Sequence, residues 1–489
     1  MNRMTLVPRT EPTRRIALFF GLLFIFSYFA QGGGFNQNAT LGEIREWVEH
    51  GRFEIDAWAS ITGDVSYYGN RAYSNKNPSV LFFVAPIYLI IFRLAVALGF
   101  DPSSASYQLV ITHALTVLCA GIWGALLSVV LVPLLRRLFS LLGETDPHRL
   151  SAIACLGTLI LPYSTVAFVH AFETFWLVTT FYFLVRHLQD GDTESLLLLG
   201  LSLGVALLAN QLFAAVAPVV VAQILWRDRR PRSLLLLGVA ALLPLLPLLA
   251  YNKVNFDSFF SSNRHHLDPA WTDPSLFLGV FGWPDVSRLG LLFGKGGKSI
   301  FPSMIFLYAG FLAPLFVDRG TTPSRYFVYP LASIMSSLLV VSSFNGWHGG
   351  SCYGPRYLTG ALTLLAVFTA PAYSRFPRTY VLLGLWSIAV MFVVTSASLW
   401  VSEEDAAPLR NSIWPAFQRA AFRGRVFPSF PDPPALFYRY NLGHLFGLEG
   451  HWSLLPVALV LSWMLHAFVR RHPLPPDSGG GSSSRAKHT

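Results

Sequence analysis

The feature that most constrains this chain is the recurrence of long apolar runs from one end to the other. A run of about 20 apolar residues is the signature of a membrane-spanning helix. Of the 489 residues, 53% are hydrophobic and only 13% are charged, whereas a soluble protein carries roughly 25% charged residues. The runs are continuous and do not alternate with polar residues, which excludes a transmembrane β-barrel. The sequence therefore predicts an all-α, polytopic membrane protein.

The basic residues predict how the chain crosses the membrane. The net charge of +10 comes largely from Lys and Arg in short loops between apolar runs, which is the pattern of cytoplasmic loops and not of a nucleic-acid-binding protein. Arg14 and Arg15 precede the first run, Ile16 to Ala30. We interpret this run as a retained span and not as a signal peptide, because no clear small-residue cleavage site follows it.

The run from Ser79 to Gly99 needs a separate interpretation. If it crossed the membrane, every later cluster of arginines would lie outside the cell, so the positive-inside rule favours about twelve crossings plus one re-entrant or interfacial helix in the first outer loop. Arg93 within the run fits a helix that is not wholly in lipid. The predicted crossings are 16–30, 107–135, 150–168, 172–188, 196–209, 211–226, 233–251, 301–317, 326–343, 357–373, 379–400 and 453–469. The outer segments are 31–106, 169–172, 252–300, 344–356 and 401–452; residues 1–470 form one transmembrane domain, and 471–489 a disordered cytoplasmic tail.

The most polar stretch of the predicted first outer loop runs from Arg52 to Pro78. It contains Glu54, Asp56 and Asp64, and a carboxylate at the membrane boundary can serve as a general base or a metal ligand. The alternative is a set of ordinary solvated carboxylates. A membrane protein does not need so polar a run between apolar helices, and we therefore interpret this stretch as the active-site loop.

A phosphate-binding arrangement is predicted where this loop ends, in the sequence S-N-K-N-P at 74–78. Pro78 suits the first turn of a helix and Asn77 suits its cap, so Lys76 lies just ahead of a helix N-terminus. Backbone N–H groups, the helix dipole and an ammonium group then all favour an anion at the same place. The alternative is an ordinary capped helix with an interfacial lysine.

Two other outer segments carry ionisable side chains. His170 and Glu173 lie at a short turn between two predicted spans, where an ionisable pair is a functional candidate and helix capping is the alternative. Arg264, His265 and His266 lie in the next long outer loop. Adjacent histidines do not share a helix face, so they do not form a ready metal pair.

A glycine-rich loop at 344–358 reads F-N-G-W-H-G-G-S-C-Y-G-P-R-Y-L. Its four glycines allow close backbone approach to a ligand. Trp347, Tyr353 and Tyr357 offer rings for stacking on sugars, and Arg356 offers a fork that matches a phosphate. The alternative is an interfacial aromatic belt with turn glycines.

These motifs together resemble the polyprenyl-phosphate-sugar-dependent glycosyltransferases of the GT-C superfamily. The matching residues are Asp56, the 74–78 step, Tyr251-Asn252 to Ser258, and Gly346 to Leu358, in an order similar to the bacterial branch related to protein O-mannosyltransferases and aminoarabinose transferases. The resemblance covers roughly residues 14 to 470. It implies a GT-C-like helical membrane fold, a lipid-linked sugar donor and an active site that faces the periplasm or cell exterior.

The resemblance also implies roles for individual residues. Asp56 matches the catalytic aspartate of the first outer loop, and Glu173 sits where some relatives carry a second acidic motif. Here that motif is H-A-F-E and not an acidic pair, so no cofactor is predicted, and a bound divalent metal is left as the alternative. The E-I-D sequence of the first loop also differs from the pair found in many relatives, so the type of acceptor does not carry over.

The predicted activity is transfer of a sugar from polyprenyl phosphate to a hydroxyl of a cell-envelope glycan, lipid or protein, with inversion and with Asp56 as general base. The predicted catalytic residues are Asp56, Asp64 and Glu173; the donor-phosphate residues are Lys76, Arg264, Arg356 and Tyr353; and the sugar or acceptor residues are Trp347, His348, His170 and Tyr357. The predicted partners are the lipid-linked donor, the acceptor and the bilayer of the inner (plasma) membrane. The alternatives are an O-antigen ligase or polymerase type of enzyme with a diphosphate-linked glycan, and a lipid or sugar transporter.

Overall fold

The computed structural model describes residues 11–139, 142–143, 146–228, 230–277, 279–293, 299–316, 324–425 and 438–469. The predicted disordered tail, 471–489, lies outside the described residues. The first helices are α1 (Glu11–Ser27), α2 (Phe35–His50), α3 (Ser79–Ala97), α4 (Ala105–Thr116), α5 (Ile122–Leu138), α6 (Asp146–Leu156), α7 (Ile160–Tyr163), α8 (His170–Asp190), α9 (Thr193–Ala209), α10 (Ala217–Arg227), α11 (Pro231–Leu242) and α12 (Leu246–Phe256). They are followed by α13 (Val286–Phe293), α14 (Tyr308–Phe311), α15 (Ala313–Phe316), α16 (Val328–Ser343), α17 (Thr359–Val367), α18 (Ala370–Arg375), α19 (Pro377–Ala397), α20 (Trp414–Gln418), α22 (Leu442–Leu445) and α23 (Leu455–Met464).

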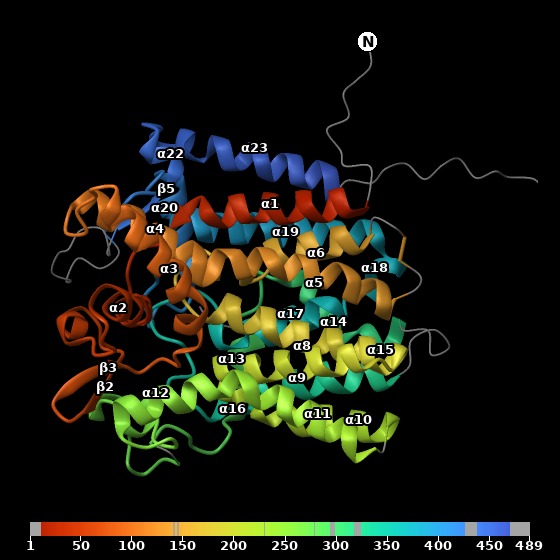
Figure 1. Cartoon of the computed structure of the whole chain (residues 1–489). Helices are drawn as coiled ribbons and strands as arrows, with labels where there is room; N and C mark the ends of the chain where they lie inside the picture. Colours follow the sequence, from red (N-terminus) through yellow and green to blue (C-terminus); the bar gives the residue numbers. More distant parts are fainter. Residues whose placement is uncertain are drawn as a thin grey trace, which may run out of the picture.

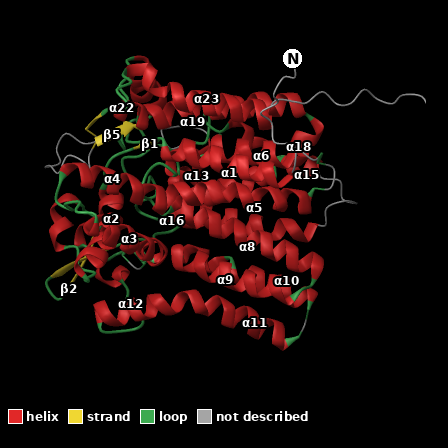
Figure 2. Cartoon of the chain, turned by 45° about the horizontal axis from the view of Figure 1, so that its top comes forward, coloured by secondary structure: helices red, strands yellow, loops and turns green. Residues whose placement is uncertain are grey.

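The long helices form one bundle with their axes roughly along a common direction. The helices α23, α1, α5, α8, α9 and α11 lie side by side in that order from one edge to the other, in both views (Figures 1 and 2). Their facing sides are apolar and buried, as at Leu18, Leu131, Leu184 and Leu199. The apolar side chains of these helices thus pack against one another inside the bundle and also suit contact with lipid on its outside.

Six helical segments among the described residues are long and apolar enough to cross a membrane: Ser79–Ala97, Ala105–Leu138, Pro231–Phe256, Arg356–Arg375, Pro377–Ala397 and Gly450–Val469. The chain is therefore an integral membrane protein. Helices also occupy the other predicted crossings, but several are shorter or broken, such as α6 followed by α7. The total of twelve crossings stays a prediction.

The fold is mostly helical, as expected, and it also contains a few short strands. Strands β1 (Phe29–Ala30), β5 (Tyr438–Asn441) and β4 (Gly424–Arg425) form one small antiparallel sheet, and β2 (Val65–Tyr68) pairs with β3 (Arg71–Ser74) in a hairpin. These strands lie in segments that read as loops because each is only two to four residues long. So short a run carries no clear alternating pattern.

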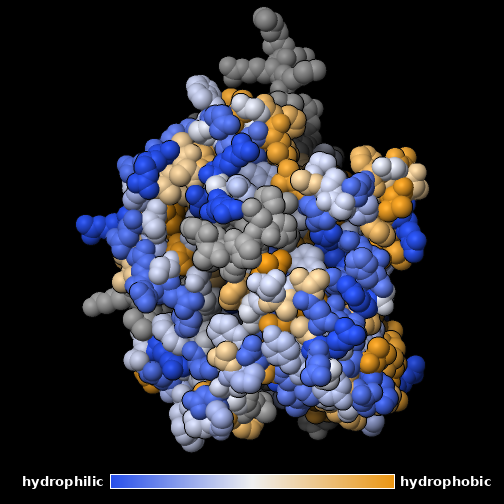
Figure 3. Space-filling view, turned by 90° about the vertical axis from the view of Figure 1, so that its left-hand side faces the viewer, coloured by the Kyte–Doolittle hydropathy of each residue, from blue (hydrophilic) through white to orange (hydrophobic). Residues whose placement is uncertain are grey.

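The strands gather with α2, α3, α12, α20 and α22 at one end of the bundle, which we call the loop end (Figure 1). Hydrophilic side chains cover most of the described surface there (Figure 3). The helix α3 packs along α2, where the Tyr88 hydroxyl donates to Glu49 Oε1 at 2.6 Å, while Phe83 packs edge-on against Phe172 of α8. Its predicted interfacial or re-entrant placement stays a prediction.

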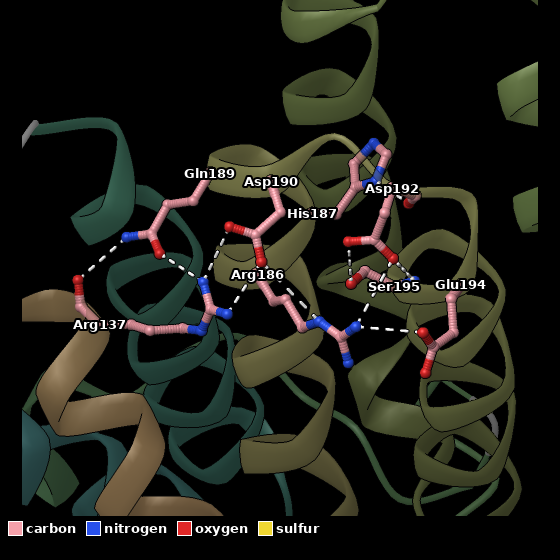
Figure 4. Close-up of polar contacts among 8 residues, drawn as sticks. All are labelled: Arg137, Arg186, His187, Gln189, Asp190, Asp192, Glu194 and Ser195. Carbon is pink, nitrogen blue, oxygen red and sulfur yellow. Dashed lines mark hydrogen bonds and ion pairs between the residues drawn. The ribbon is translucent and has the colours of Figure 1, made fainter.

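The opposite end is fastened by ion pairs between α5 and the turn from α8 to α9 (Figure 4). Arg137 donates to both carboxylate oxygens of Asp190, at 3.1 and 2.9 Å, and Arg186 reaches Glu194 at 3.2 Å. Asp192 caps α9 by accepting the backbone N–H of Ser195 at 2.6 Å. Arg137 and Arg186 are each paired with carboxylates of this turn, so the cluster closes the turn from α8 to α9.

The contact between α9 and α11 depends on two glycines four residues apart, Gly200 and Gly204. A Cβ atom at Gly204 would lie 2.2 Å from the backbone oxygen of Ala241, and one at Gly200 would lie 2.6 Å from the Cβ of Ala240. Small residues at this spacing let two membrane helices approach closely.

We therefore expect Gly204→Val to destabilise the protein by about 1 to 3 kcal/mol, the usual cost of overpacking, and to lower the thermal unfolding midpoint in detergent. Gly238→Val on α11 is the matched control, because nothing lies within 4 Å of a Cβ placed there. Equal midpoints for the two variants would contradict the close helix contact.

Candidate active site

The hairpin of β2 and β3 brings Lys76 and Asp64 together. Val65 pairs with Ser74 in the antiparallel register, so the residues just outside that pair come to lie opposite each other. Lys76 Nζ is 2.9 Å from Asp64 Oδ2, and Asn75 Nδ2 donates to Asp64 Oδ1 at 3.3 Å. Both charged side chains keep some contact with solvent, 23% for Lys76 and 19% for Asp64. The pair thus lies where a ligand can reach it.

Arg264 is placed beside this pair by its neighbour Asn263. The Asn263 side-chain amide donates to the backbone oxygens of Ser74 and Lys76, and the Asn263 backbone oxygen accepts from Ser66 Oγ at 2.8 Å. These bonds attach the short 3₁₀ helix Asn263–His266 to the hairpin. The Arg264 guanidinium makes no hydrogen bond or ion pair with any described residue and is exposed.

Arg356 enters the same site from the glycine-rich loop. Its guanidinium carbon lies 5.0 Å from the ring centroids of both Phe168 and Tyr357, close enough for cation–π attraction. Its Nε atom is buried without a hydrogen-bond partner among the described residues. Gly349 has φ of 72°, and a Cβ there would lie 3.0 Å from the Arg356 side chain. Glycine at this position therefore avoids a close contact with the Arg356 side chain and adopts the positive φ without strain.

The charges at this site do not balance. Burial lowers the pKa of Lys76 to about 8; Asp64 opposes this shift, while Arg264 and Arg356 add to it. Burial alone would raise the pKa of Asp64, but Lys76 and then Arg356 outweigh burial and hold that pKa below its ordinary value. Burial also lowers the pKa of Arg264, although its side chain stays open to solvent. Three cations thus face one carboxylate, and the arrangement can bind an anion.

His170 and Glu173 form a second polar group next to Arg356. His170 Nδ1 is 2.9 Å from Glu173 Oε1, and Asn210 Nδ2 donates to Glu173 Oε2 at 2.9 Å. The imidazole packs edge-on against Phe168 and Tyr357, the two rings that also hold Arg356.

An unwound segment sets the position of this pair. Residues 164–168 between α7 and α8 are buried but not helical, and the backbone N–H of Ala167 is satisfied by Gln37 Oε1 at 3.0 Å. Irregular backbone of this kind is tolerated where it is buried in protein. The segment starts α8 at His170 and brings Phe168 against Arg356.

Asp56, the aspartate expected from the resemblance, is not part of the cation group. It accepts from Arg71 Nη1 at 2.9 Å and from the Ala72 backbone N–H at 2.7 Å. Burial alone would raise its pKa, but these two partners lower it. Arg71 is paired with Tyr68 at the turn of the hairpin, three residues from the end that carries Asp64, and three residues of strand span roughly 10 Å. The described residues give Asp56 no contact with Lys76, Arg264 or Arg356.

The remaining predicted residues divide between the site and its surroundings. Tyr357 lies in the site. Tyr353 is buried, and its hydroxyl is paired with Ser303 Oγ, which places it in the core and away from the cations. His348 faces Glu403 with Nδ1 3.3 Å from Oε2, and Trp347 packs partly buried against the core.

Sequence analysis missed Asn75, Phe168, Asn210 and Asn263. Asn75 and Asn263 adjoin residues that were identified, so their position in the chain was an available signal. Nothing local marks Phe168 or Asn210, which act through contacts distant in sequence. The described residues contain no group of three or more His, Cys, Asp or Glu able to hold a metal ion.

Comparison with solved structures identifies the architecture. ArnT from Cupriavidus metallidurans in the apo state matches with a TM-score of 0.52 and 16% sequence identity, over 94% of this chain and 76% of that one. This chain has the ArnT fold. The helical membrane fold implied by the resemblance agrees with this similarity, which concerns the fold alone.

Two further similarities are weaker. ArnT from the same organism bound to undecaprenyl phosphate matches with a TM-score of 0.49 and 15% identity, over 94% of this chain and 74% of that one. The oligosaccharyltransferase of Archaeoglobus fulgidus in the apo form matches with a TM-score of 0.41 and 13% identity, over 79% of this chain, which spans about 54% of that protein's length. No family model and no curated protein matches the sequence.

The ion pair between Lys76 and Asp64 leads to a prediction about the pKa of Lys76. Because the Asp64 charge raises the pKa of Lys76, we expect Asp64→Asn to lower it below about 8. Competitive labelling with an amine-reactive reagent as a function of pH, read by mass spectrometry, measures this pKa. Asp56→Asn is the matched control and should leave it unchanged. Equal shifts in both variants would show that the two aspartates act on Lys76 alike.

Proposed function

We propose that the protein is a membrane glycosyltransferase that moves a sugar from a polyprenyl-phosphate donor to a hydroxyl of a cell-envelope acceptor, with inversion. The observation that carries the proposal is the group of Lys76, Arg264 and Arg356 around the single carboxylate of Asp64. This group sits at the loop end of an apolar helix bundle with the ArnT fold. A phosphate at the end of a membrane-embedded lipid fits both the charge and the location.

The cations supply what the leaving group requires. A departing polyprenyl phosphate is already a weak base, so no carboxylic acid is needed to protonate it, whereas inverting glycosidases need both an acid and a base. The negative charge that grows on the phosphate oxygen instead needs fixed positive charge. Lys76 and Arg356 supply that charge at the site, and Arg264 makes no hydrogen bond or ion pair with another described residue.

We assign the general base to Asp64 in preference to Asp56. When the donor phosphate pairs with Lys76, Asp64 loses its ion-pair partner and can take the acceptor proton. The acceptor oxygen then bonds to the anomeric carbon, the bond from that carbon to the phosphate oxygen breaks, and its electron pair leaves with the phosphate. Asp56 is held by Arg71 and Ala72, away from the cations. Glu173 is assigned to holding His170.

The setting of the reaction follows from the same argument. The plasma membrane supplies the lipid donor, and the loop end is assigned to the periplasmic or extracellular side, where the envelope acceptor lies. Trp347 and His348, beside Glu403, are assigned to the acceptor side. Neither a metal nor a cofactor enters any step.

A diphosphate-linked glycan is the second candidate donor. The specific observation in its favour is that the three cations leave two positive charges uncompensated by Asp64, which suits a diphosphate. Competition between monophosphate and diphosphate lipids for binding to the purified protein separates the two donors: the proposed function expects the monophosphate-linked sugar to bind more tightly.

The assignment of the base predicts different results for two aspartates. With a radiolabelled polyprenyl-monophosphate sugar in membranes, Asp64→Asn should lower the transfer rate by about 100- to 10,000-fold, the usual contribution of a general base. Asp56→Asn should retain most activity. The reverse ranking would restore Asp56 as the base, and full activity in both variants would remove a carboxylate from the mechanism.

The pKa of Lys76 leads to a prediction about the pH dependence of donor binding. This pKa of about 8 means that the ammonium is present below that pH and is lost as the pH rises through it, so the affinity for polyprenyl phosphate should fall above about pH 8. Lys76→Arg should remove this decline, because arginine stays charged. Lys76→Ala should weaken binding about 10-fold or more at neutral pH, as expected for a lost charge-assisted hydrogen bond. A flat pH profile in the natural protein would contradict the role of Lys76.

A further inference from the structure

We infer that the site selects an uncharged, hydroxylated sugar, and that His170 accepts a hydrogen bond from one of its hydroxyl groups. The inference rests on the proposed function and narrows its substrate class. It is carried by the geometry of the His170–Glu173 pair, by the place of this pair beside the phosphate-binding cations, and by the absence of an uncommitted carboxylate in this part of the described chain.

The contacts of His170 determine which of its nitrogens is available. Glu173 Oε1 lies 2.9 Å from Nδ1, and its Oε2 accepts from Asn210. A carboxylate only accepts hydrogen bonds, so Nδ1 must carry the proton, and the neutral ring then has a free lone pair on Nε2. His170 is only 3% exposed, and Nε2 has no partner among the described residues. A buried acceptor without a donor costs free energy, and a hydroxyl of the substrate satisfies it.

The surroundings of His170 fit a sugar. Its ring lies edge-on to Tyr163, Phe168 and Tyr357, with centroids 5.3 to 5.9 Å apart. Phe168 and Tyr357 also hold Arg356, so His170 is one aromatic layer from the phosphate-binding cations. In the donor the sugar is bonded directly to the phosphate. A phosphate on Arg356 therefore places the sugar next to this wall of rings and the imidazole.

The charges argue against a cationic amino sugar. Lys76, Arg264 and Arg356 all act on this region, and the charges of Lys76 and Arg356 reach His170. The nearby carboxylates are already engaged: Glu173 with His170 and Asn210, and Asp64 with Lys76 before the donor binds and, in the proposed mechanism, with the acceptor hydroxyl afterwards. An ammonium group on the sugar would lie beside three positive charges without a protein carboxylate of its own, whereas a hydroxyl meets a lone pair.

A second buried histidine on the same helix gives a matched control. His187 is also 3% exposed with an unpaired Nε2, but its Nδ1 is bonded to the backbone oxygen of Asp192 in the ion-pair cluster at the opposite end of α8 (Figure 4). Within the described part of the chain, no aromatic ring packs against its imidazole. Replacing it tests what removal of a buried imidazole from α8 does by itself.

The experiment measures displacement of radiolabelled undecaprenyl phosphate from the full-length protein in nanodiscs at neutral pH. The competitors are undecaprenyl-phosphate glucose, mannose and galactose, each paired with its unacetylated amino-deoxy counterpart. We expect the best neutral sugar to bind at least tenfold more tightly than its amino partner. His170→Ala should weaken that sugar lipid about tenfold and leave undecaprenyl phosphate itself unchanged, His187→Ala should change neither, and His170→Gln, which keeps an acceptor, should restore part of the loss.

Other outcomes would overturn the inference. Equal affinity for the neutral and amino forms in every pair removes the charge selection. An equal loss for the sugar-free lipid in His170→Ala, or the same loss in His187→Ala, shows a structural role for the imidazole. The proposed function fails separately: in that case no undecaprenyl-phosphate lipid binds, or Lys76→Ala leaves the binding of all of them unchanged, and this inference falls with it.

Discussion

The ion pair between Lys76 and Asp64 is the interaction on which the loop end depends. The pair places the negative charge of Asp64 among three positive charges. Without Asp64, the partly desolvated Lys76, Arg264 and Arg356 would repel one another. Removing one partner of a buried pair leaves an uncompensated charge, which is more costly than leaving the pair in place. Because one carboxylate cannot balance three cations, the site keeps a net positive charge. The same pair therefore stabilises the site and leaves it ready for an anion.

This site is assembled from segments far apart in the chain, and each is held by backbone interactions. The β2–β3 hairpin presents Asp64 and Lys76, the amide of Asn263 attaches Arg264 to that hairpin, and the unwound residues 164–168 set Phe168 and His170 against Arg356. The apolar helix bundle, to which these irregular segments are joined at the loop end, provides the scaffold that positions them. Function on loops held by a rigid scaffold is a common arrangement.

Many residues of the site could be predicted from their chemistry, but the sequence did not show which aspartate pairs with which cation. Lys76, Arg264 and Arg356 stand out in the sequence because cations are rare in an apolar chain and each lies in a polar segment. The choice between Asp56 and Asp64 could not be made in the same way, because both are loop carboxylates and only the register of the hairpin separates them. Tyr353 lies in the glycine-rich loop and was expected to bind the donor phosphate, yet its ring is buried and its hydroxyl is bound to Ser303.

The sequence by itself determined that this is a helical membrane protein whose polar chemistry lies in a few long loops. Hydrophobic runs act locally: a long apolar segment must bury or hydrogen-bond its own backbone in lipid, and the helix does so without distant partners. Only the tertiary structure decided which carboxylate faces the cations, that His170 presents a free Nε2, and that Asn210 and Phe168 belong to the site. These are matters of distance between segments up to hundreds of residues apart, and no local pattern encodes such distances.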